Sequence, residues 1–405
     1  MEKIVITSAV RTPVGAFLGG LKTVPVQELA AHVIKGAVER SNLNPSQVND
    51  VVLGHVISSA DTGNMARHAA LLAGLTDTPA FCVNRICGSG IQAVATAAME
   101  LRCNDDMEVV VAGGAESLSR VPYYLPLSTR YEGLKNLNKA LLCSNEEYAK
   151  NSQPSSVYPD IDSMGITAEN VIDRYNISRE DCDQFSYDSQ MKAKKAMESG
   201  RMAEEIIPVE VKSRKETIIV DTDEHPRPQT TMEALAKLKP AFKQGGTVTA
   251  GSSSGMNDAA AALVLMTERK CLEMGLKPMA YVEDFAVTAL DPRVMGLGPV
   301  GAINKLLKKS DLKLEDIGLL EINEAFAGQV LGCLKELGNY IDTPLYKNLN
   351  VNGGAVALGH PLGMSGARLV GTICHEFKHS DAKYGIASAC IGGGQGIALL
   401  LRRPE

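Results

Sequence analysis

A strand, a glycine turn and a buried helix are predicted by Val83-Asn84-Arg85-Ile86-Cys87-Gly88-Ser89-Gly90 and its continuation, Ile91-Gln92-Ala93-Val94-Ala95-Thr96-Ala97-Ala98-Met99. The small apolar residues after the turn indicate a helix that is buried nearly all round. We expect Gly88 and Gly90 to permit positive φ and close backbone approach, and to leave space for a substrate. Cys87 then lies at the helix N-terminus, where free N–H groups favour a thiolate. A free cysteine is more often simply buried, so the turn makes Cys87 a candidate nucleophile.

Length, charge and cysteine content restrict the class of protein. A chain of 405 residues is long enough for two or three domains. With a net charge of −6 and no long basic run, we expect neither a nucleic acid nor a membrane surface as a partner. The N-terminal segment is strand-like, without the pattern of a signal or transit peptide. The nine cysteines lack CxxC spacing and fit reduced thiols, so we expect a cytoplasmic protein with no metal or other cofactor.

Strands alternate with helices in the first part of the chain. Apolar runs predict strands at 3–9, 51–54, 81–86 and 109–114, and helical periodicity predicts helices at 26–40 and 65–73. This alternation is typical of an α/β fold whose layers contain much parallel sheet.

The same order of elements returns in the second part. A predicted strand at 317–322 ends in Asn323, as the strand at 51–54 ends in His55. The segments 349–354 and 384–394 likewise repeat 83–90 and 109–114, and a helix is expected to begin near Ser365. Two similar halves predict α/β units related by a pseudo-twofold axis, with equivalent loops meeting at one site.

A segment of different composition, about 117–249, lies between the repeated parts. It is rich in prolines, tyrosines and charges, and Ser178-Arg179-Glu180-Asp181 predicts the start of a helix at 178–199. We expect an inserted loop domain that caps the mouth of the site. The predicted domains are therefore 1–271, which includes this insertion, and 272–405.

Four motifs resemble those of the thiolase family and follow the family's order. They are Asn84-Arg85-Ile86-Cys87-Gly88-Ser89-Gly90, Asn323-Glu324-Ala325-Phe326, Asn352-Gly353-Gly354-Ala355 with Gly359-His360-Pro361, and Cys390-Ile391-Gly392-Gly393-Gly394-Gln395-Gly396. The resemblance covers essentially the whole chain. It implies the layered αβαβα fold of that family and a homodimer or homotetramer. The opening segment 9–20 is most similar to the biosynthetic branch, the acetyl-CoA acetyltransferases.

The resemblance also implies a role for each residue of the site. Cys87 would take an acetyl group and His360 would accept its proton. Cys390 would then remove a proton from a second acetyl-CoA, whose carbanion attacks acetyl-Cys87 to give acetoacetyl-CoA. The N–H groups of Cys87 and Gly392 would hold one oxyanion, while His360 and a water fixed by Asn323 would hold the other.

Acetyl-CoA and CoA are the ligands that the resemblance implies. Ser254 would contact the pantetheine, Arg227 would lie near the nucleotide, and Met164 belongs to the pantetheine loop. Met295 and Phe326 would line the acyl pocket. Ser163 stands where biosynthetic members usually have histidine, which leaves a degradative 3-ketoacyl-CoA thiolase of fatty acid β-oxidation as an alternative.

Two other classes of protein, a dinucleotide-binding oxidoreductase and a non-catalytic acyl-CoA-binding protein, agree less well with the sequence. A dinucleotide-binding oxidoreductase is disfavoured because no GxGxxG with a suitably spaced acidic residue follows the first strand. A non-catalytic acyl-CoA-binding protein would have no reason to keep Cys87, His360 and Cys390 together. The remaining histidines lack such context and are interpreted as structural or surface residues: His32, His55, His68, His225, His375 and His379.

Overall fold

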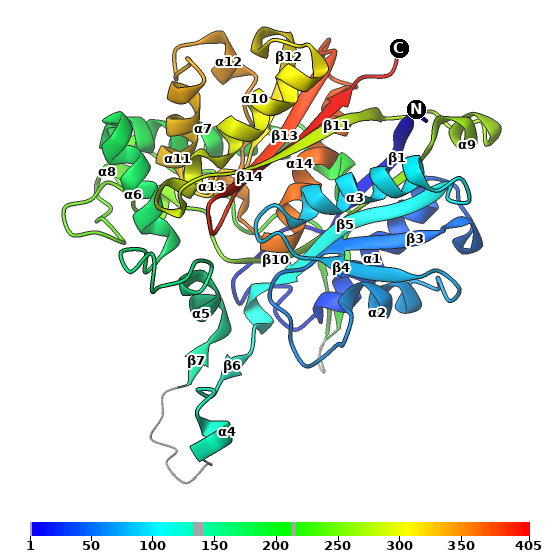
Figure 1. Ribbon diagram of the computed structural model, residues 1–405, viewed down its shortest axis with the longest axis horizontal. Helices are drawn as coiled ribbons and strands as arrows, with labels where there is room; N and C mark the ends of the chain where they lie inside the picture. Colours follow the sequence, from blue (N-terminus) through cyan, green and yellow to red (C-terminus); the bar gives the residue numbers. More distant parts are fainter. Residues whose placement is uncertain (1, 133–140, 213–215) are drawn as a thin grey trace.

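Two strands from different halves of the chain, β1 (Ile4–Arg11) and β11 (Ala280–Ala289), pair with each other and join the halves. In this computed structural model residues 2–132, 141–212 and 216–405 are described (Figure 1). The other strands of the joint sheet are β2 (Gly15–Ala16), β3 (Asp50–Gly54), β4 (Ala80–Val83), β5 (Val109–Ser117), β10 (Asn257–Thr267), β12 (Ile317–Ile322), β13 (Tyr384–Ile391) and β14 (Gln395–Arg402). Its order is β12-β13-β14-β11-β1-β10-β5-β3-β4, with β2 beside β10.

The strands on either side of the β1–β11 pair repeat one another. From β1 outward the pairings are antiparallel to β10 and β5 and then parallel to β3 and β4. From β11 outward they are antiparallel to β14 and β13 and then parallel to β12, beyond which Leu349 forms a parallel bridge with Leu320. The predicted pair of pseudo-twofold α/β units is confirmed.

Helices fill the layer between the two halves of the sheet and cover both outer faces. α3 (Ser89–Cys103) and α14 (Leu362–Glu376) have 15 residues each and pack on one another in the middle layer (Figure 1). α1 (Val26–Arg40) and α2 (Met65–Leu72) cover the first half of the sheet. α10 (Gly298–Ser310) covers the second half, with α11 (Ala327–Glu336) beside it. These layers confirm the αβαβα fold class.

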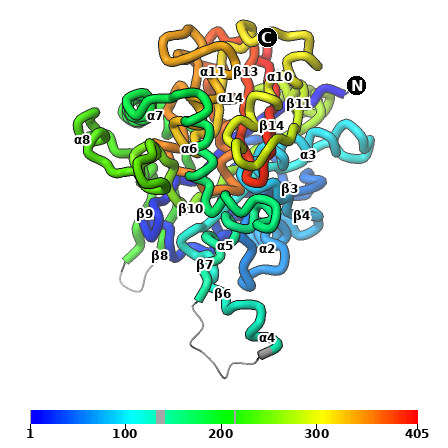
Figure 2. The backbone as a smooth tube through the Cα atoms, turned by 60° about the vertical axis from the view of Figure 1, so that its left-hand side comes forward, coloured from blue at the N-terminus to red at the C-terminus, as the bar shows by residue number. Residues whose placement is uncertain are grey.

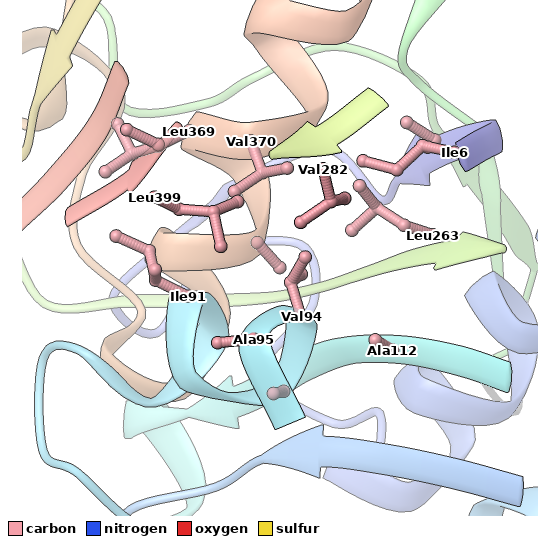
Figure 3. Close-up of a cluster of buried hydrophobic side chains, with 14 of the residues drawn as sticks. Ile6, Ile91, Val94, Ala95, Ala112, Leu263, Val282, Leu369, Val370 and Leu399 are labelled. Carbon is pink, nitrogen blue, oxygen red and sulfur yellow. The ribbon is translucent and has the colours of Figure 1, made fainter. Parts of the chain in front are cut away.

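The middle helices are apolar nearly all round because each faces a sheet as well as the other helix. Figure 3 shows Ile91 and Val94 of α3 close to Val370 of α14 and Leu399 of β14, all with 0 % exposure. Each such side chain contributes about 1.5–3 kcal/mol when it leaves water. This layer therefore fixes the two helix N-termini relative to each other. α14 begins at Leu362, three residues before the expected start.

The residues between β5 and β10 form a mostly helical region (Figure 2). The helix predicted at 178–199 is α7, whose first residue follows Ser178, the side chain that accepts the Asp181 N–H. α6 (Met164–Tyr175) and α7 (Arg179–Glu198) pack against α11, so this region contacts the second half of the chain. Residues 133–140 and 213–215 of the predicted insertion lie outside the described residues. The helices and strands described between β5 and β10 are β6 (Tyr123–Tyr124), α4 (Thr129–Glu132), β7 (Leu142–Cys143), α5 (Ser144–Lys150), α6 (Met164–Tyr175), α7 (Arg179–Glu198), β8 (Val209–Lys212), β9 (Thr217–Val220) and α8 (Met232–Ala236).

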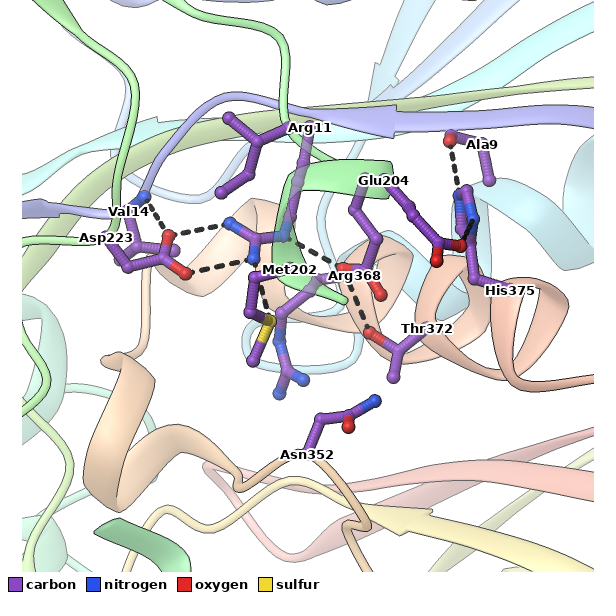
Figure 4. A network of polar contacts seen from close by, with 12 residues as sticks. Ala9, Arg11, Val14, Met202, Glu204, Asp223, Asn352, Arg368, Thr372 and His375 are labelled. Atoms are coloured by element: carbon purple, nitrogen blue, oxygen red, sulfur yellow. Dashed lines mark hydrogen bonds and ion pairs between the residues drawn. The ribbon is translucent and has the colours of Figure 1, made fainter. Parts of the chain in front are cut away.

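The last residue of β1, Arg11, ties this region to the sheet (Figure 4). Its guanidinium donates to both carboxylate oxygens of Asp223, at 2.7 and 2.9 Å, and to Glu205 at 3.0 Å. Arg11 is only 2 % exposed. Burial alone would raise the pKa of Glu205, but the charges of Arg11 and Arg201 outweigh burial and hold that pKa at about 2.

Arg11→Leu should lower the free energy of unfolding by about 3–5 kcal/mol, because the substitution leaves the buried Asp223 without its cation and Glu205 with Arg201 alone. Urea denaturation followed by circular dichroism at pH 7 measures the change. Arg293→Leu is the control, since the ion pair of Arg293 with Asp160 lies in solvent and should contribute far less. Equal losses in the two variants would show that the Arg11 network does not stabilise the fold.

Candidate active site

The chain turns sharply between β4 and α3, and Cys87 lies in this turn. Ile86 has φ +46°, a left-handed conformation that a β-branched residue rarely adopts. Asn84 holds it there, because its Oδ1 accepts the Ile86 N–H at 2.9 Å, and Ser89 Oγ donates to the Ile86 carbonyl at 2.6 Å. Strain of this kind is found at functional sites. Cys87 immediately precedes Gly88, the N-cap residue of α3.

Two expectations for the glycines of this turn, positive φ and space for a substrate, are wrong, while the expected close backbone approach is confirmed. Gly88 has φ −85°, and Gly90 lies inside the helix without positive φ. A Cβ at Gly88 would lie 2.7 Å from the Cδ1 of Ile391, and a Cβ at Gly90 would lie 2.4 Å from the Ala367 nitrogen. The glycines therefore allow α3 to approach the second half of the chain closely, and the space beside them is filled by protein.

The residue Cys87 is partly accessible, yet its surroundings favour the thiol over the thiolate. Burial raises the pKa of Cys87 to about 11, while hydrogen bonds from the N–H groups of Gly392 and of Cys87 itself act in the opposite direction. The expectation of a thiolate is thus wrong, because the cost of burying a charge exceeds the effect of the backbone donors. A proton acceptor must accompany the thiol.

His360 is such an acceptor. Its Nδ1 lies 2.6 Å from Ser365 Oγ, which donates its hydrogen to the Pro361 carbonyl at 2.9 Å. Nδ1 must then carry the ring proton, which leaves a lone pair on Nε2, 3.3 Å from the side-chain nitrogen of Asn323. Burial lowers the pKa of His360 to about 4, with a smaller contribution from the charge of Arg368. The imidazole is therefore neutral at physiological pH.

Asn323 and Cys390 lie at the ends of adjacent parallel strands, β12 and β13. Both are fully buried. Asn323 Oδ1 has no hydrogen-bond partner among the described residues. Burial raises the pKa of Cys390 well above its usual range, and a charge on Cys87 raises it further. Cys87 is thus close enough to Cys390 to influence its ionisation.

The turn between β13 and β14 carries Gly392. Gly393 and Gly394 have φ +79° and +81°, which only glycine adopts easily, and they allow this hairpin to close tightly. The N–H of Gly392 thereby points to the thiol of Cys87. A donor pair formed by Gly392 and Cys87 is suited to an oxyanion.

A cavity of about 550 Å³ connects these groups to solvent. It has the size usual for a small-molecule site. Seven of the predicted site residues line it: Cys87, His360, Gly392, Met164, Met295, Phe326 and Ser254. Asn323 and Cys390 do not line it and are buried. Arg227 lines a neighbouring cavity of about 690 Å³, which shares Ser254 with the first.

Some functional residues were not found from the sequence. Ser365 fixes the tautomer of His360, and Asn257 accepts the His360 N–H at 3.1 Å. Phe242 packs edge-to-face on Phe326, with ring centroids 5.8 Å apart, and lines both cavities. The motif around His360 could have indicated Ser365, because the hydroxyl lies only a short distance further along the same predicted helix start. No pattern in the sequence indicated Phe242.

Membrane-spanning helices and metal-binding clusters are absent from the described residues. No helix in these ranges combines the length and the apolar character that crossing a membrane requires. No group of three or more His, Cys, Asp or Glu side chains is arranged there to hold a metal ion.

Comparisons with known proteins identify the family. The family models described as "Thiolase, N-terminal domain" and "Thiolase, C-terminal domain" match residues 4–269 and 276–403. The chain therefore belongs to the thiolase family, as the resemblance of its motifs implied.

Similar proteins match over the full length. The acetyl-CoA acetyltransferase of Pseudomonas aeruginosa is 45 % identical over 405 residues, with 100 % of both chains covered. The crystal structure of the Bacillus anthracis acetyl-CoA acetyltransferase has a TM-score of 0.93 and 43 % identity, with 100 % of this chain and 99 % of that chain covered. The human mitochondrial 3-ketoacyl-CoA thiolase has a TM-score of 0.91 and 39 % identity, with the same coverage.

Proposed function

We propose that this thiolase is an acetyl-CoA C-acetyltransferase, which condenses two acetyl-CoA molecules to acetoacetyl-CoA and CoA and catalyses the reverse reaction. One observation carries the proposal: Cys87, His360 and the N–H donor Gly392 face one cavity, with the thiol against that donor. The high identity to proteins named acetyl-CoA acetyltransferase supports the substrate. The test is release of CoA from acetyl-CoA and CoA-dependent loss of acetoacetyl-CoA.

The first step is acetyl transfer to Cys87. Its sulfur attacks the thioester carbonyl, and its proton passes to Nε2 of His360, the ring nitrogen that carries a lone pair. The N–H groups of Cys87 and Gly392 hold the oxygen of the tetrahedral intermediate. The bond to the CoA sulfur then breaks, and His360 returns the proton to the departing thiolate. This leaves acetyl-Cys87, free CoA and a neutral imidazole.

The second step forms the carbon–carbon bond. Cys390 passes its thiol proton to Nε2 of His360, and the resulting thiolate removes a proton from the methyl carbon of the second acetyl-CoA, which then attacks acetyl-Cys87. Acetylation has by then removed the possibility of a charge on Cys87, which would raise the pKa of Cys390. The protonated Nε2 of His360 donates a hydrogen bond to the enolate oxygen. A water bound to Asn323 Oδ1, a buried acceptor without a partner in the described chain, donates a second one. The Cys87 sulfur leaves and takes the proton from Nε2 of His360, which gives acetoacetyl-CoA and restores the Cys87 thiol, the Cys390 thiol and the neutral imidazole.

Coenzyme A would extend through the two adjoining cavities. Ser254 borders both cavities and would contact the pantetheine, and Arg227, which lines the neighbouring cavity, would lie near the nucleotide. Met164 lies at the first turn of α6, beside the pantetheine path. Met295 and Phe326 form an apolar wall close to Cys87, suited to a short acyl chain.

The pKa of His360 predicts the pH dependence of acetylation. Because the pKa is lowered to about 4, the ring binds a proton only below that pH and loses its ability to accept one from Cys87. The single-turnover rate constant for acetylation should therefore stay level from about pH 8 down to about pH 5 and fall near pH 4. Circular dichroism at each pH controls for unfolding. An acid limb near pH 6.5 would show that His360 titrates as an exposed histidine.

Ser163 bears on chain length and on the alternative of a 3-ketoacyl-CoA thiolase. Its side chain makes no cap hydrogen bond at the start of α6, and it lines the cavity beside Met164. We expect a preference for acetoacetyl-CoA with tolerance of 3-ketohexanoyl-CoA, because each methylene changes binding by only about 1–3 kcal/mol. Ser163→His should raise the ratio of the two kcat/KM values by about tenfold. An unchanged ratio, equal to that of the control Ser199→His, would place the acyl chain elsewhere.

We also propose a cytoplasmic homodimer or homotetramer. All nine cysteines are free thiols, which suits a reducing compartment. β4 is the open edge of the sheet, and Leu71, Leu72 and Met99 on the adjacent helices are exposed, which together suit a face that pairs with a second copy. Leu127 and Tyr131, each 87 % exposed, extend from the β6–β7 region and suit a further contact. Light scattering measures the assembly.

A further inference from the structure

A buried carboxylate connects the two loops that carry Cys87 and His360. Glu116, near the end of β5, is 1 % exposed. One of its oxygens accepts the N–H groups of Val56 and Gly363, each at 3.0 Å, and the other accepts the Ile57 N–H at 3.2 Å. A side chain that binds three backbone donors from two distant segments fixes those segments relative to one another.

One set of contacts leads from Glu116 to Cys87. The carbonyl of Val56 accepts a hydrogen bond from the side-chain nitrogen of Asn84 at 3.2 Å. The oxygen of the same amide holds Ile86 in its left-handed conformation, directly before the nucleophile. Movement of the Val56 peptide would therefore be transmitted to the strained turn.

The other set of contacts leads to His360. Gly363 lies in the first turn of α14, three residues after His360, and its N–H belongs to the free donors of the helix N-terminus. A carboxylate at this end of a helix is favoured by the helix dipole. Gly363 also has no room for a side chain, because a Cβ would lie 2.6 Å from the Gly54 carbonyl. Glu116 thus anchors the helix that presents the imidazole.

The pseudo-twofold axis gives this carboxylate a counterpart in the other half. Gly54 pairs with Gly114 as Ile322 pairs with Ser388, so His55 corresponds to Asn323, and Glu116 corresponds to Cys390. His55 Nδ1 lies 3.3 Å from Glu116. Burial alone would lower the pKa of His55, but the hydrogen bond and charge of Glu116 outweigh it and raise that pKa. The first half therefore holds a histidine–carboxylate pair at the two positions that carry the amide and the second thiol in the other half.

We infer that Glu116, supported by His55, is a positioning residue that sets the placement of the Cys87 thiol relative to Nε2 of His360. The inference rests on the proposed function, in which this pair performs acetyl transfer. Glu116 touches neither the substrate nor the reacting atoms. It acts on the geometry of proton transfer, where small displacements change rates strongly. Its charge also raises the pKa of Cys87, so loss of that charge alone would favour the thiolate and would not slow acetylation.

The test is the single-turnover rate constant for acetylation of Cys87 in Glu116→Gln, measured with saturating acetyl-CoA in the full-length protein. The amide nitrogen cannot accept a hydrogen bond, so at least one of the backbone N–H groups loses its partner. We expect the rate constant to fall about tenfold or more, with KM changed less than threefold. Loss of folded protein alone reduces the amplitude of the reaction and leaves the rate constant unchanged, which separates positioning from a structural role.

Glu169→Gln is the matched control. Glu169 is also 1 % exposed and accepts backbone N–H groups from Thr247 and Val248, each at 2.9 Å, in a loop that carries neither Cys87 nor His360. Its rate constant should stay within twofold of that of the wild type.

His55→Gln, which leaves the carboxylate in place, is the second variant and serves if Glu116→Gln does not fold. We expect its rate constant to fall threefold or more. Wild-type rate constants in whichever of the two variants fold would overturn the inference while the proposed function stands. A wild-type protein that is not acetylated at Cys87 would instead contradict the proposed function.

Discussion

Cys390→Ala should slow the condensation of two acetyl-CoA molecules by about 10³-fold while Cys87 is still acetylated. In the proposed reaction the Cys390 sulfur performs only the proton transfer of the second step. Alanine cannot replace it, and the strand position leaves no other titratable side chain of β13 beside the thiol of Cys87. The acetylation rate constant should stay within about tenfold of that of the wild type, although groups that act together can lose more than their own step.

Two assays separate the steps in this variant. Quenched-flow mass spectrometry reports acetyl-enzyme, and acetoacetyl-CoA formation reports condensation. Cys374→Ala is the control, because it also removes a fully buried thiol but lies within α14, in the central core. Condensation at the wild-type rate in Cys390→Ala would make Cys390 a structural residue.

His360→Gln should slow the acetylation of Cys87 by about 10²–10⁴-fold. Glutamine can still accept a hydrogen bond from Asn323, but it cannot take up the thiol proton. The variant must then rely on the small fraction of thiolate that exists below the thiol pKa of about 11. Its rate constant should consequently rise about tenfold per pH unit between pH 7 and 9, a range over which the wild type stays level.

His375→Gln is the control for His360→Gln. His375 is another buried histidine of α14, but its Nε2 contacts the Ala9 carbonyl at 2.9 Å, away from the cavity. A level pH profile in His360→Gln, or equal losses in both variants, would exclude His360 as the proton acceptor.

The repeat within the sequence predicted the architecture correctly because the strands and helices of each half follow from short patterns of apolar residues. Apolar runs such as 109–114 and 317–322 lie within β5 and β12, and each forms a strand buried in the sheet. Cys87 and His360 occupy equivalent positions, each directly before the N-cap residue of a 15-residue middle helix. The motifs around them could therefore be assigned to one site from their order and spacing along the chain.

The roles of several residues could not be predicted, because they depend on contacts between distant segments. Gly88 and Gly90 suggested positive φ, but their lack of a side chain is required by Ile391 and Ala367 of the other half. The pKa of Cys87 depends on how much protein surrounds it, which a helix N-terminus alone does not reveal. Glu116 connects segments that are far apart along the chain, and no spacing rule identifies such a link.

The central claim is that Cys87 carries the acetyl group. Protein mixed briefly with acetyl-CoA, quenched in acid and digested should show the mass of one acetyl group on the peptide that contains Cys87, and on no other cysteine peptide. An acetyl group on a different cysteine would contradict this account, and so would bound acetyl-CoA without any acetylated cysteine, the result expected of a non-catalytic acyl-CoA-binding protein.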